Sequence, residues 1–548
     1  MHGLMMNSPL TITSIMQHAE RNSPNGEMVS VTVDQPLHRQ TYAEAFARAR
    51  RLANVLNRLG LSPADRVATL AWNDYRHFEL YYAVSCAGYV LHTINPRLFA
   101  EQIAYIVNHA EDKYIFTDPM FVPMLEKLAQ ELPGVKGYVV MTDAAHMPDS
   151  SLPNLMGYEE LLAAESEDYQ WPDLGEDSAS ALCYTSGTTG NPKGVLYSHR
   201  ATVLHAYASA LPDVMNLAAR DVVLPVVPLF HANGWGTAYT APMVGAKLVF
   251  PGPKLGDGKT LHQLMESEKV TAALGVPTVW LALLQYLRES GSTLSTLERT
   301  IVGGSACPLA IMDEFREKHG VNTHHAWGMT EMSPLGTFNS LLPGMEDLDR
   351  NALQAIRSKQ GRAVYGVEMK IVDDDDAEIA WDGQQFGTLK VRGPWIASDY
   401  YRMEEGSDAF DSDGWFNTGD VATIDANGYM QITDRTKDVI KSGGEWISSI
   451  DLENAAVAHP AVIEAAVIGV PHSKWAERPL MIVVLEDGKE ADKTELLEFL
   501  SGHVARWWLP DDIVFVDEIP HTATGKINKL GLRQKFSDYV LPTAKAAE

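Results

Sequence analysis

The first two-thirds of this 548-residue chain alternate between helix-like and strand-like segments, which restricts the fold more than any other feature. Tyr42 to Leu59 carries its apolar residues on one helical face and is followed by Gly60, a typical stop signal. The alternation continues with strands expected at 66–72, 113–117, 221–227, 246–250, 271–275, 300–302 and 323–326, and helices at 99–110, 261–267 and 308–319. Such alternation predicts mostly parallel sheets with helices packed on their faces, an α/β fold.

The sequence changes character after about Gly387, where turn signals crowd together. After about residue 436 a compact unit follows, with helices expected at 449–458 and 493–504 and strands at 462–470, 480–485 and 513–516. We therefore predict a large N-terminal α/β domain joined by a short linker to a small α+β C-terminal domain.

Composition excludes several classes of protein. The formal charge of −27 argues against nucleic acid or an anionic membrane as the main partner. The three cysteines form no CxxC pair, so neither a disulfide framework nor a zinc ribbon is expected. No apolar run reaches about 18 residues, so no transmembrane helix is expected. The first residues lack the pattern of a signal peptide, and we expect a cytoplasmic protein.

The most informative segment is the glycine-rich stretch from Tyr184 to Gly194, which reads YTSGTTGNPKG. Its glycines allow backbone N–H groups to point at phosphate oxygens, while its hydroxyls and Lys193 add further donors. A flexible surface loop is the alternative that this composition leaves open. The segment is not a P-loop, because Pro-Lys-Gly follows where Gly-Lys-Ser/Thr is required. Gly258-Lys259-Thr260 is rejected as a P-loop because Pro253 occupies the position of the first glycine.

This stretch resembles the signature loop of the adenylate-forming, or AMP-binding, superfamily, which includes acyl-CoA synthetases. Four further motifs match in the expected order: WGMTE at 327–331, NTGD at 417–420, DRTKD at 434–438 with KSGGE at 441–445, and TATGK at 522–526. Within the superfamily, the segments PLFHANGWG and KSGGEWIS are most similar to bacterial medium-chain fatty-acid–CoA ligases and to 3-methylmercaptopropionate–CoA ligases.

The resemblance implies an ATP-dependent ligase that converts a medium- to long-chain fatty acid through acyl-AMP to acyl-CoA. It also implies an N-terminal domain at residues 1–434, a hinge at 435–445 and a mobile C-terminal lid at 446–548. The implied substrates are a carboxylic acid, ATP and CoA, and the implied cofactor is Mg²⁺. A homodimer is expected from the long-chain relatives alone.

The resemblance also assigns roles to individual residues. Lys526 is the expected adenylation catalyst, aided by Thr330 and Glu331, and Glu331 and Thr185 are the expected Mg²⁺ ligands. The expected ATP and AMP site consists of Thr185, Ser186, Gly187, Thr188, Thr189, Gly190, Lys193, Gly304, Ser305, His325, Ala326, Trp327, Thr330, Asp420, Arg435, Lys437 and Lys441. The expected acyl pocket includes His231, Trp235 and Trp446, and the expected CoA path includes Ser442, Gly443 and Gly444. A lone histidine is more often structural, and little acid–base chemistry is expected of His231.

Several alternatives stay open at this point. The acid substrate is either a fatty acid or a short thioether or aryl acid such as 3-methylmercaptopropionate. An oxygen-using, luciferase-like enzyme would consume oxygen or emit light, and a peptide-synthetase module would carry a carrier domain. A non-catalytic acyl-adenylate sensor should have lost Lys526, Glu331 or Asp420, and all three are present.

Overall fold

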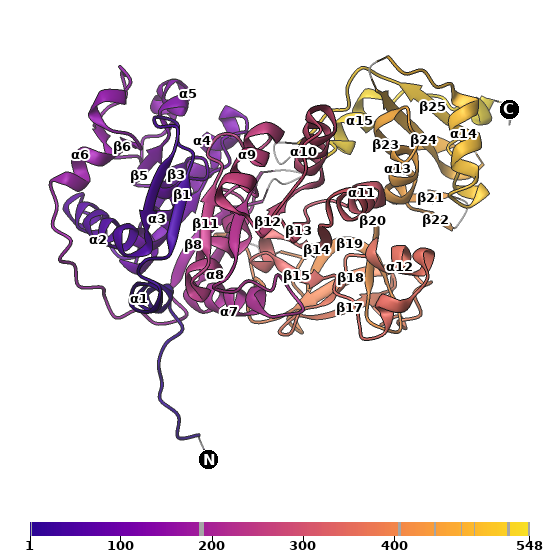
Figure 1. The fold of residues 1–548 in the computed structure, drawn as a ribbon. Helices are drawn as coiled ribbons and strands as arrows, with labels where there is room; N and C mark the ends of the chain where they lie inside the picture. Colours follow the sequence, from indigo (N-terminus) through magenta and orange to yellow (C-terminus); the bar gives the residue numbers. More distant parts are fainter. Residues whose placement is uncertain are drawn as a thin grey trace.

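The chain folds into a large body, which we define as the residues up to Thr436, and a smaller lid that follows it (Figure 1). This computed structural model describes residue 1 and residues 3–185, 191–403, 407–442, 445–472, 474–486, 488–522 and 526–545. In Figure 1 the lid lies at one end of the body, next to β19 (Phe416–Ile424) and β20 (Met430–Arg435). The predicted α/β fold with a smaller C-terminal domain is confirmed.

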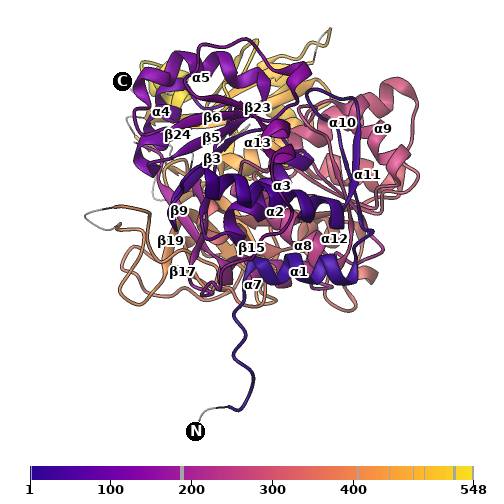
Figure 2. The same ribbon diagram turned by 90° about the vertical axis from the view of Figure 1, so that its left-hand side faces the viewer.

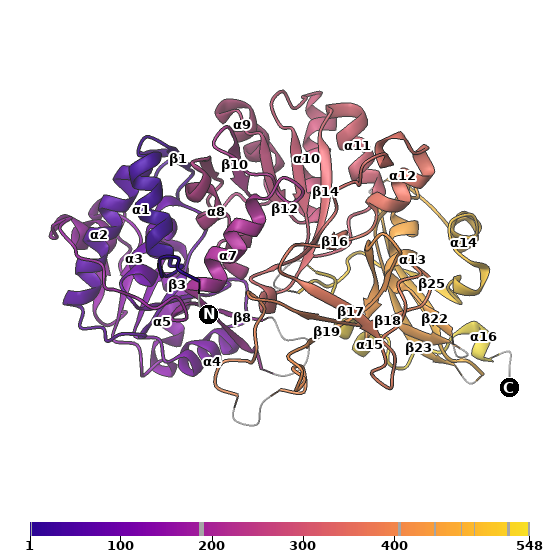
Figure 3. The same ribbon diagram turned by 90° about the horizontal axis from the view of Figure 1, so that it is seen from below.

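Two large sheets, both mostly parallel, form the framework of the body (Figure 3). The seven-stranded sheet has the order β7 (Leu155–Gly157), β6 (Gly137–Val140), β5 (Tyr114–Thr117), β3 (Arg66–Leu70), β4 (Val90–Thr93), β8 (Ala179–Tyr184), β9 (Gly194–Ser198). The nine-stranded sheet has the order β16 (Arg362–Ala363), β15 (Leu335–Phe338), β14 (Asn322–Gly328), β13 (Arg299–Val302), β12 (Ala272–Gly275), β10 (Val222–Pro225), β11 (Lys247–Phe250), β1 (Glu27–Ser30), β2 (His38–Thr41).

Two smaller sheets complete the fold. The body's antiparallel sheet has the order β17 (Glu368–Val372), β18 (Gly387–Arg392), β19, β20. The lid's sheet has the order β22 (Glu445–Ile447), β21 (Ile440–Ser442), β24 (Ala476–Leu485), β23 (Val462–His472), and β25 (Asp512–Phe515) also pairs with β24. The strand pair β19–β20 therefore brings the body's last sheet to the start of the lid.

Helices cover the sheets of both parts. Those of the body are α1 (Ile12–Asn22), α2 (Tyr42–Arg58), α3 (Tyr75–Cys86), α4 (Ala100–Ala110), α5 (Val122–Leu128), α6 (Tyr158–Ala163), α7 (His199–Ala210), α8 (Thr237–Val244), α9 (Gly258–Glu268), α10 (Pro277–Ser290), α11 (Leu309–His319) and α12 (Arg350–Arg357). Those of the lid are α13 (Ser449–Val457), α14 (Lys493–Ser501), α15 (Lys529–Lys535) and α16 (Pro542–Lys545). Figure 2 shows the first residues leaving the body beside α1.

Local sequence explains where several helices begin and end. Thr41 and Glu44 form a capping box at the start of α2, and Gly60 follows the helix with φ +73°. The Gly258-Lys259-Thr260 segment begins α9, and the Asp257 carboxylate caps it by accepting from the Thr260 N–H. A carboxylate of the protein therefore occupies the place where a P-loop would bind a phosphate, which agrees with the rejection of a P-loop there.

The body and the lid have separate apolar cores. All three cysteines are buried and unpaired, as expected for a chain without a disulfide framework. Among the described residues, every helix is too short or too polar to cross a membrane.

Candidate active site

Three predicted nucleotide-binding residues meet where β14 approaches the β19–β20 pair. The indole Nε1 of Trp327 donates to Asp420 Oδ2 at 2.9 Å, and Arg435 Nε lies 2.7 Å from Asp420 Oδ1. Asp420 is buried, whereas Arg435 keeps 45% of its side chain exposed. The structure therefore holds this carboxylate between an indole and a partly exposed guanidinium. Its predicted contact with ribose hydroxyls remains a prediction.

A second group surrounds Glu331 and Thr330 on the turn after β14. The buried Glu331 accepts a hydrogen bond from the Tyr400 hydroxyl at 2.7 Å, and Lys193 Nζ lies 4.6 Å from the centre of the Tyr400 ring. The Tyr197 hydroxyl donates to the backbone oxygen of Thr330 at 2.6 Å. Two tyrosines thus position the residues expected to contact phosphate and metal.

The two ends of the glycine-rich loop are held together. The Thr185 N–H donates to the Lys193 oxygen at 2.8 Å, and the Lys193 N–H donates to Thr185 Oγ1 at 3.4 Å. The predicted phosphate-binding residues Ser186, Gly187, Thr188, Thr189 and Gly190 lie outside the described residues. The described end of the loop lies near Glu331, because Lys193 contacts the Tyr400 ring and the Tyr400 hydroxyl donates to Glu331.

Four further residues of the expected nucleotide site lie after β13 and along β14. Gly304 has φ +83°, a conformation that favours glycine, and Ser305 is exposed. His325 and Ala326 are buried on β14. Burial lowers the pKa of His325 to about 4, so its imidazole is neutral near pH 7.

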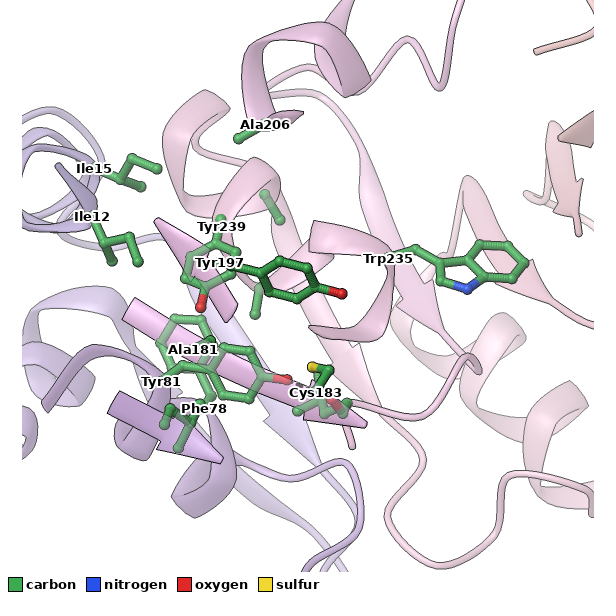
Figure 4. Close-up of a cluster of buried hydrophobic side chains, with 14 of the residues drawn as sticks. Ile12, Ile15, Phe78, Tyr81, Ala181, Cys183, Tyr197, Ala206, Trp235 and Tyr239 are labelled. Atoms are coloured by element: carbon green, nitrogen blue, oxygen red, sulfur yellow. Dashed lines mark hydrogen bonds between the residues drawn. The ribbon is translucent and has the colours of Figure 1, made fainter. Parts of the chain in front are cut away.

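Trp235 lies in a segment of unusual backbone. Residues 232–236 all have positive φ, between 44° and 74°, although only two are glycines. Left-handed backbone costs roughly 1–2 kcal/mol for each non-glycine residue, so the surrounding packing must compensate. A Cβ at Gly303 would stand 3.0 Å from the Trp235 ring, which therefore packs against glycine backbone. Figure 4 shows this indole pointing away from a buried cluster that includes Tyr81, Tyr197 and Cys183.

His231 precedes this turn and lies within electrostatic range of Lys526 in the lid. With Thr185 and Phe230 it lines a narrow pocket at the ends of β4 and β8. Burial lowers its pKa to about 4, and the Lys526 charge lowers it further in the same direction. The imidazole is neutral near pH 7, which agrees with the expectation of little acid–base chemistry.

Lys526 extends from the lid toward the nucleotide residues of the body. The side chain remains accessible to solvent, but surrounding protein atoms desolvate its ammonium group and lower its pKa to about 8. Arg435 lowers that pKa further, while the carboxylates of Asp420 and Glu331 raise it. The ammonium group therefore lies within the electrostatic field of three body residues that the sequence assigned to one site.

The chain passes from body to lid around Lys437. The Thr436 N–H and hydroxyl both bond to the Gly419 oxygen on β19, at 2.9 and 3.1 Å. One residue beyond Lys437, the Asp438 carboxylate pairs with Arg533 on α15. The two residues that flank Lys437 thus bond to different parts of the molecule, Thr436 to β19 of the body and Asp438 to α15 of the lid. The predicted hinge at this position remains a prediction.

The remaining predicted residues lie beyond this point. Lys441 is exposed on β21, and its N–H donates to Glu477 Oε2 at 3.1 Å. Ser442 is buried and accepts from Arg478 Nη1 at 3.2 Å. Gly443, Gly444 and the side chain of Trp446 lie outside the described residues, so their predicted places on the CoA path and in the acyl pocket are untested.

Two functional neighbours were not predicted. Tyr400 and Tyr197 come from segments without any motif, and each contacts the site through a single hydroxyl from a distant part of the chain. The sequence carries no local signal for such contacts, because they depend on how separate strands and loops pack.

The donor set near Glu331 suits a divalent cation. The carboxylate is buried, and no lysine, arginine or histidine among the described residues lies within ion-pair distance of it. A buried carboxylate without an ion-pair partner is well suited to an added Mg²⁺, which prefers oxygen ligands. Thr185, the other expected ligand, would supply a second oxygen through its hydroxyl.

Comparison with known proteins agrees with this geometry. The description "AMP-binding enzyme" fits residues 16–401, and "AMP-binding enzyme C-terminal domain" fits residues 451–526. The chain is 50% identical to the medium-chain-fatty-acid–CoA ligase of Ectopseudomonas oleovorans, with 100% of both chains covered. It is 51% identical to the 3-methylmercaptopropionyl-CoA ligase of Ruegeria lacuscaerulensis, covering 98% of this chain and 99% of that protein.

A solved structure extends the comparison to the whole fold. The anthranilate CoA ligase AuaEII, crystallised with anthranoyl-AMP, superposes with a TM-score of 0.85 at 25% identity, covering 96% of this chain and 98% of the other. Both sequence and fold therefore agree with the motifs over nearly the full length. The chain belongs to the AMP-binding enzyme family of acid–thiol ligases.

Proposed function

We propose that this protein is an ATP-dependent ligase that converts a medium-chain carboxylic acid to its CoA thioester through an acyl-AMP intermediate. The observation that carries this proposal is the position of Lys526. Lys526 belongs to the lid, yet its ammonium group lies within the electrostatic field of Asp420, Glu331 and Arg435, which all belong to the body. Such an arrangement brings a cation to the place where two anionic substrates must meet.

In the first half-reaction, the acid's carboxylate attacks the α-phosphorus of ATP and pyrophosphate leaves. Both reactants are anions, so positioning and charge neutralisation provide most of the catalysis. Lys526 neutralises charge between them, while Thr330 donates to the α-phosphate. Asp420 accepts hydrogen bonds from the ribose hydroxyls, and Trp327 lies beside the adenine.

Glu331 and Thr185 would hold Mg²⁺, which would neutralise charge on the ATP phosphates. The hydrogen bond from Tyr400 fixes the orientation of the Glu331 carboxylate before the cation arrives. The glycine-rich loop and Lys193 would bind the β- and γ-phosphates of ATP.

In the second half-reaction, the CoA thiol attacks the acyl carbon of acyl-AMP and AMP leaves. Rotation at Lys437 would bring a different lid face to the site. The lid carries a groove lined by Trp475, Trp507 and Arg478, with Lys474 at 4.5 Å from the Trp475 ring centre. Aromatic faces beside cations suit the adenine and phosphates of CoA, and Arg478 links this groove to Ser442.

A short thioether acid such as 3-methylmercaptopropionate is the second candidate substrate. Its support is the 51% identity to the Ruegeria enzyme, which is close to the 50% identity to the medium-chain ligase. Homodimerisation and a cytoplasmic location remain proposals that rest on the relatives and the sequence.

A panel of acids tests the function and separates the candidates. The purified protein is incubated with ATP, Mg²⁺ and acids ranging from 3-methylmercaptopropionate to palmitate, with and without CoA. We expect acid-dependent pyrophosphate release, and AMP and acyl-CoA in equal amounts once CoA is added. The absence of pyrophosphate release with every acid would overturn the proposal, whereas the preferred acid decides between the two substrate classes.

A further inference from the structure

A buried polar cluster joins the end of β20 to the lid, outside the residues already assigned to substrates. Asp434 Oδ2 accepts from the Ser449 N–H at 2.9 Å and from the Ser449 hydroxyl at 2.5 Å. Lys529 Nζ donates to the same hydroxyl, lies 2.9 Å from Glu453 Oε1 and 4.0 Å from Asp434 Oδ1. Asp434 comes from the body, while the other three residues come from the lid. We refer to these four residues as the Asp434 cluster.

The cluster is part of the contact between body and lid. Only 1% of the Asp434 side chain is exposed, and Ser449 is fully buried at the start of α13. The adjacent Ser448 hydroxyl donates to the Thr433 oxygen at 2.7 Å. Because a carboxylate at a helix N-terminus is stabilised by the helix dipole, Asp434 also favours the position of α13. Rotation of the lid about Lys437 must break all of these bonds together.

The same cluster is close in sequence to the catalytic lysine. Lys529 is three residues beyond Lys526 and begins α15. Asp434 immediately precedes Arg435, and neighbouring residues of a strand face opposite sides. Arg435 therefore faces the candidate nucleotide site while Asp434 faces the lid. The end of β20 thus contacts both the nucleotide residues of the body and the lid that carries Lys526.

We infer that Asp434 is a positioning residue, which holds the lid in the pose that presents Lys526 to ATP and the acid. The inference rests on the proposed function and adds a residue that acts only through others. Loss of the Asp434 carboxylate should impair acyl-AMP formation more than thioester formation, because only the first half-reaction needs this lid position.

The chain offers a matched control. Asp438 also pairs with a cation of α15, Arg533, but it lies on the lid side of Lys437. That ion pair moves with the lid and is common to both poses. Asp438→Asn therefore removes a similar interaction with the same helix without favouring either pose.

Two assays are run on wild type, Asp434→Asn and Asp438→Asn. The first measures pyrophosphate release from ATP and acid without CoA, and the second measures acyl-CoA formation from supplied acyl-AMP. For Asp434→Asn we expect the ratio of first to second rate to fall roughly tenfold, as the loss of a charged hydrogen bond implies. For Asp438→Asn we expect that ratio to stay at the wild-type value.

An equal loss in both assays, or an unchanged ratio for Asp434→Asn, would overturn the inference. If wild type performs neither half-reaction, the proposed function fails instead. Should Asp434→Asn be poorly folded by circular dichroism, Ser449→Ala replaces it, since that change removes one hydroxyl and keeps the backbone N–H. A smaller fall of the same ratio is then expected, and no fall would again overturn the inference.

Discussion

The body and the lid contribute to the site in different ways. The body's residues are held by buried or partly buried partners: Asp420 by Trp327 and Arg435, and Glu331 by Tyr400. The lid provides Lys526, which is accessible to solvent and depends on the position of a whole domain. In the proposed function, the body therefore provides preformed binding groups, and the position of the lid would decide when the first half-reaction can begin.

This difference separates two kinds of defect. A change in the body should affect every step that uses the nucleotide, because in the proposed function acyl-AMP would occupy the same residues in both half-reactions. A change to the lid lysine or to the pivot should affect the two half-reactions unequally. The following predictions use this contrast.

Lys526→Ala should have the largest effect. Removing one preorganised charge from the transition state costs roughly 100- to 1,000-fold in rate, and we expect that loss in pyrophosphate release. Conversion of supplied acyl-AMP to thioester should stay near the wild-type rate. Lys535→Ala, which removes an exposed lysine of α15, is the control. Equal losses in both half-reactions would contradict the role given to Lys526.

Asp420→Asn should raise KM for ATP roughly 10- to 100-fold, because a neutral amide forms weaker hydrogen bonds than a carboxylate. Unlike the lysine change, it should also weaken the use of supplied acyl-AMP. Asp413→Asn, at an exposed turn of the same part of the body, should leave both rates unchanged. A selective loss of only one half-reaction would contradict the contrast between body and lid.

Lys437→Pro should restrict rotation between the two poses. Proline fixes φ near −65°, and backbone strain of about 1–3 kcal/mol in the disfavoured pose corresponds to roughly 5- to 150-fold in its population. We expect single-turnover acyl-AMP formation to persist while the thioester step slows. Rapid-quench measurement of both steps tests this, and unchanged rates in both would argue against a pivot at Lys437.

The pH dependence should be the smallest effect. The folded pKa of Lys526 is lowered to about 8, so its charge is present below pH 8 and lost above it. We expect kcat/KM for pyrophosphate release to fall about tenfold per unit above that pH, since kcat/KM reports the free enzyme. The conversion of supplied acyl-AMP should not decline in this range. A flat first half-reaction between pH 7 and 9.5 would show that the protonation of Lys526 is not required.

Much of the fold was predictable because surface helices and half-buried strands leave a periodic pattern. The amphipathic α2 was predicted nearly to its ends from the apolar face and from Gly60. By contrast, α3 was missed, since every residue of this helix is buried and no polar face marks its period. The body's antiparallel sheet was recognised only as a region of short strands and turns.

The candidate site was predictable where chemistry is concentrated in short motifs. Trp327, Asp420 and Arg435 were named from three separate motifs, and the structure brings them into direct contact. That Trp327 donates its N–H to Asp420 was not foreseen, because two motifs 93 residues apart give no relative orientation. Tyr400 was missed for the same reason, since its loop matches no motif and gives no sign that it packs against Glu331.

The opposite orientations of Asp434 and Arg435 on β20 also bear on engineering. In a chimera that joins this body to a relative's lid, the position of the junction decides which of the two proteins supplies the residue at position 434. A junction at residue 437 keeps Asp434 with the body, so the incoming lid must offer matching groups where Ser449 and Lys529 stand here. Donor lids should therefore be chosen by those two positions before overall identity is considered.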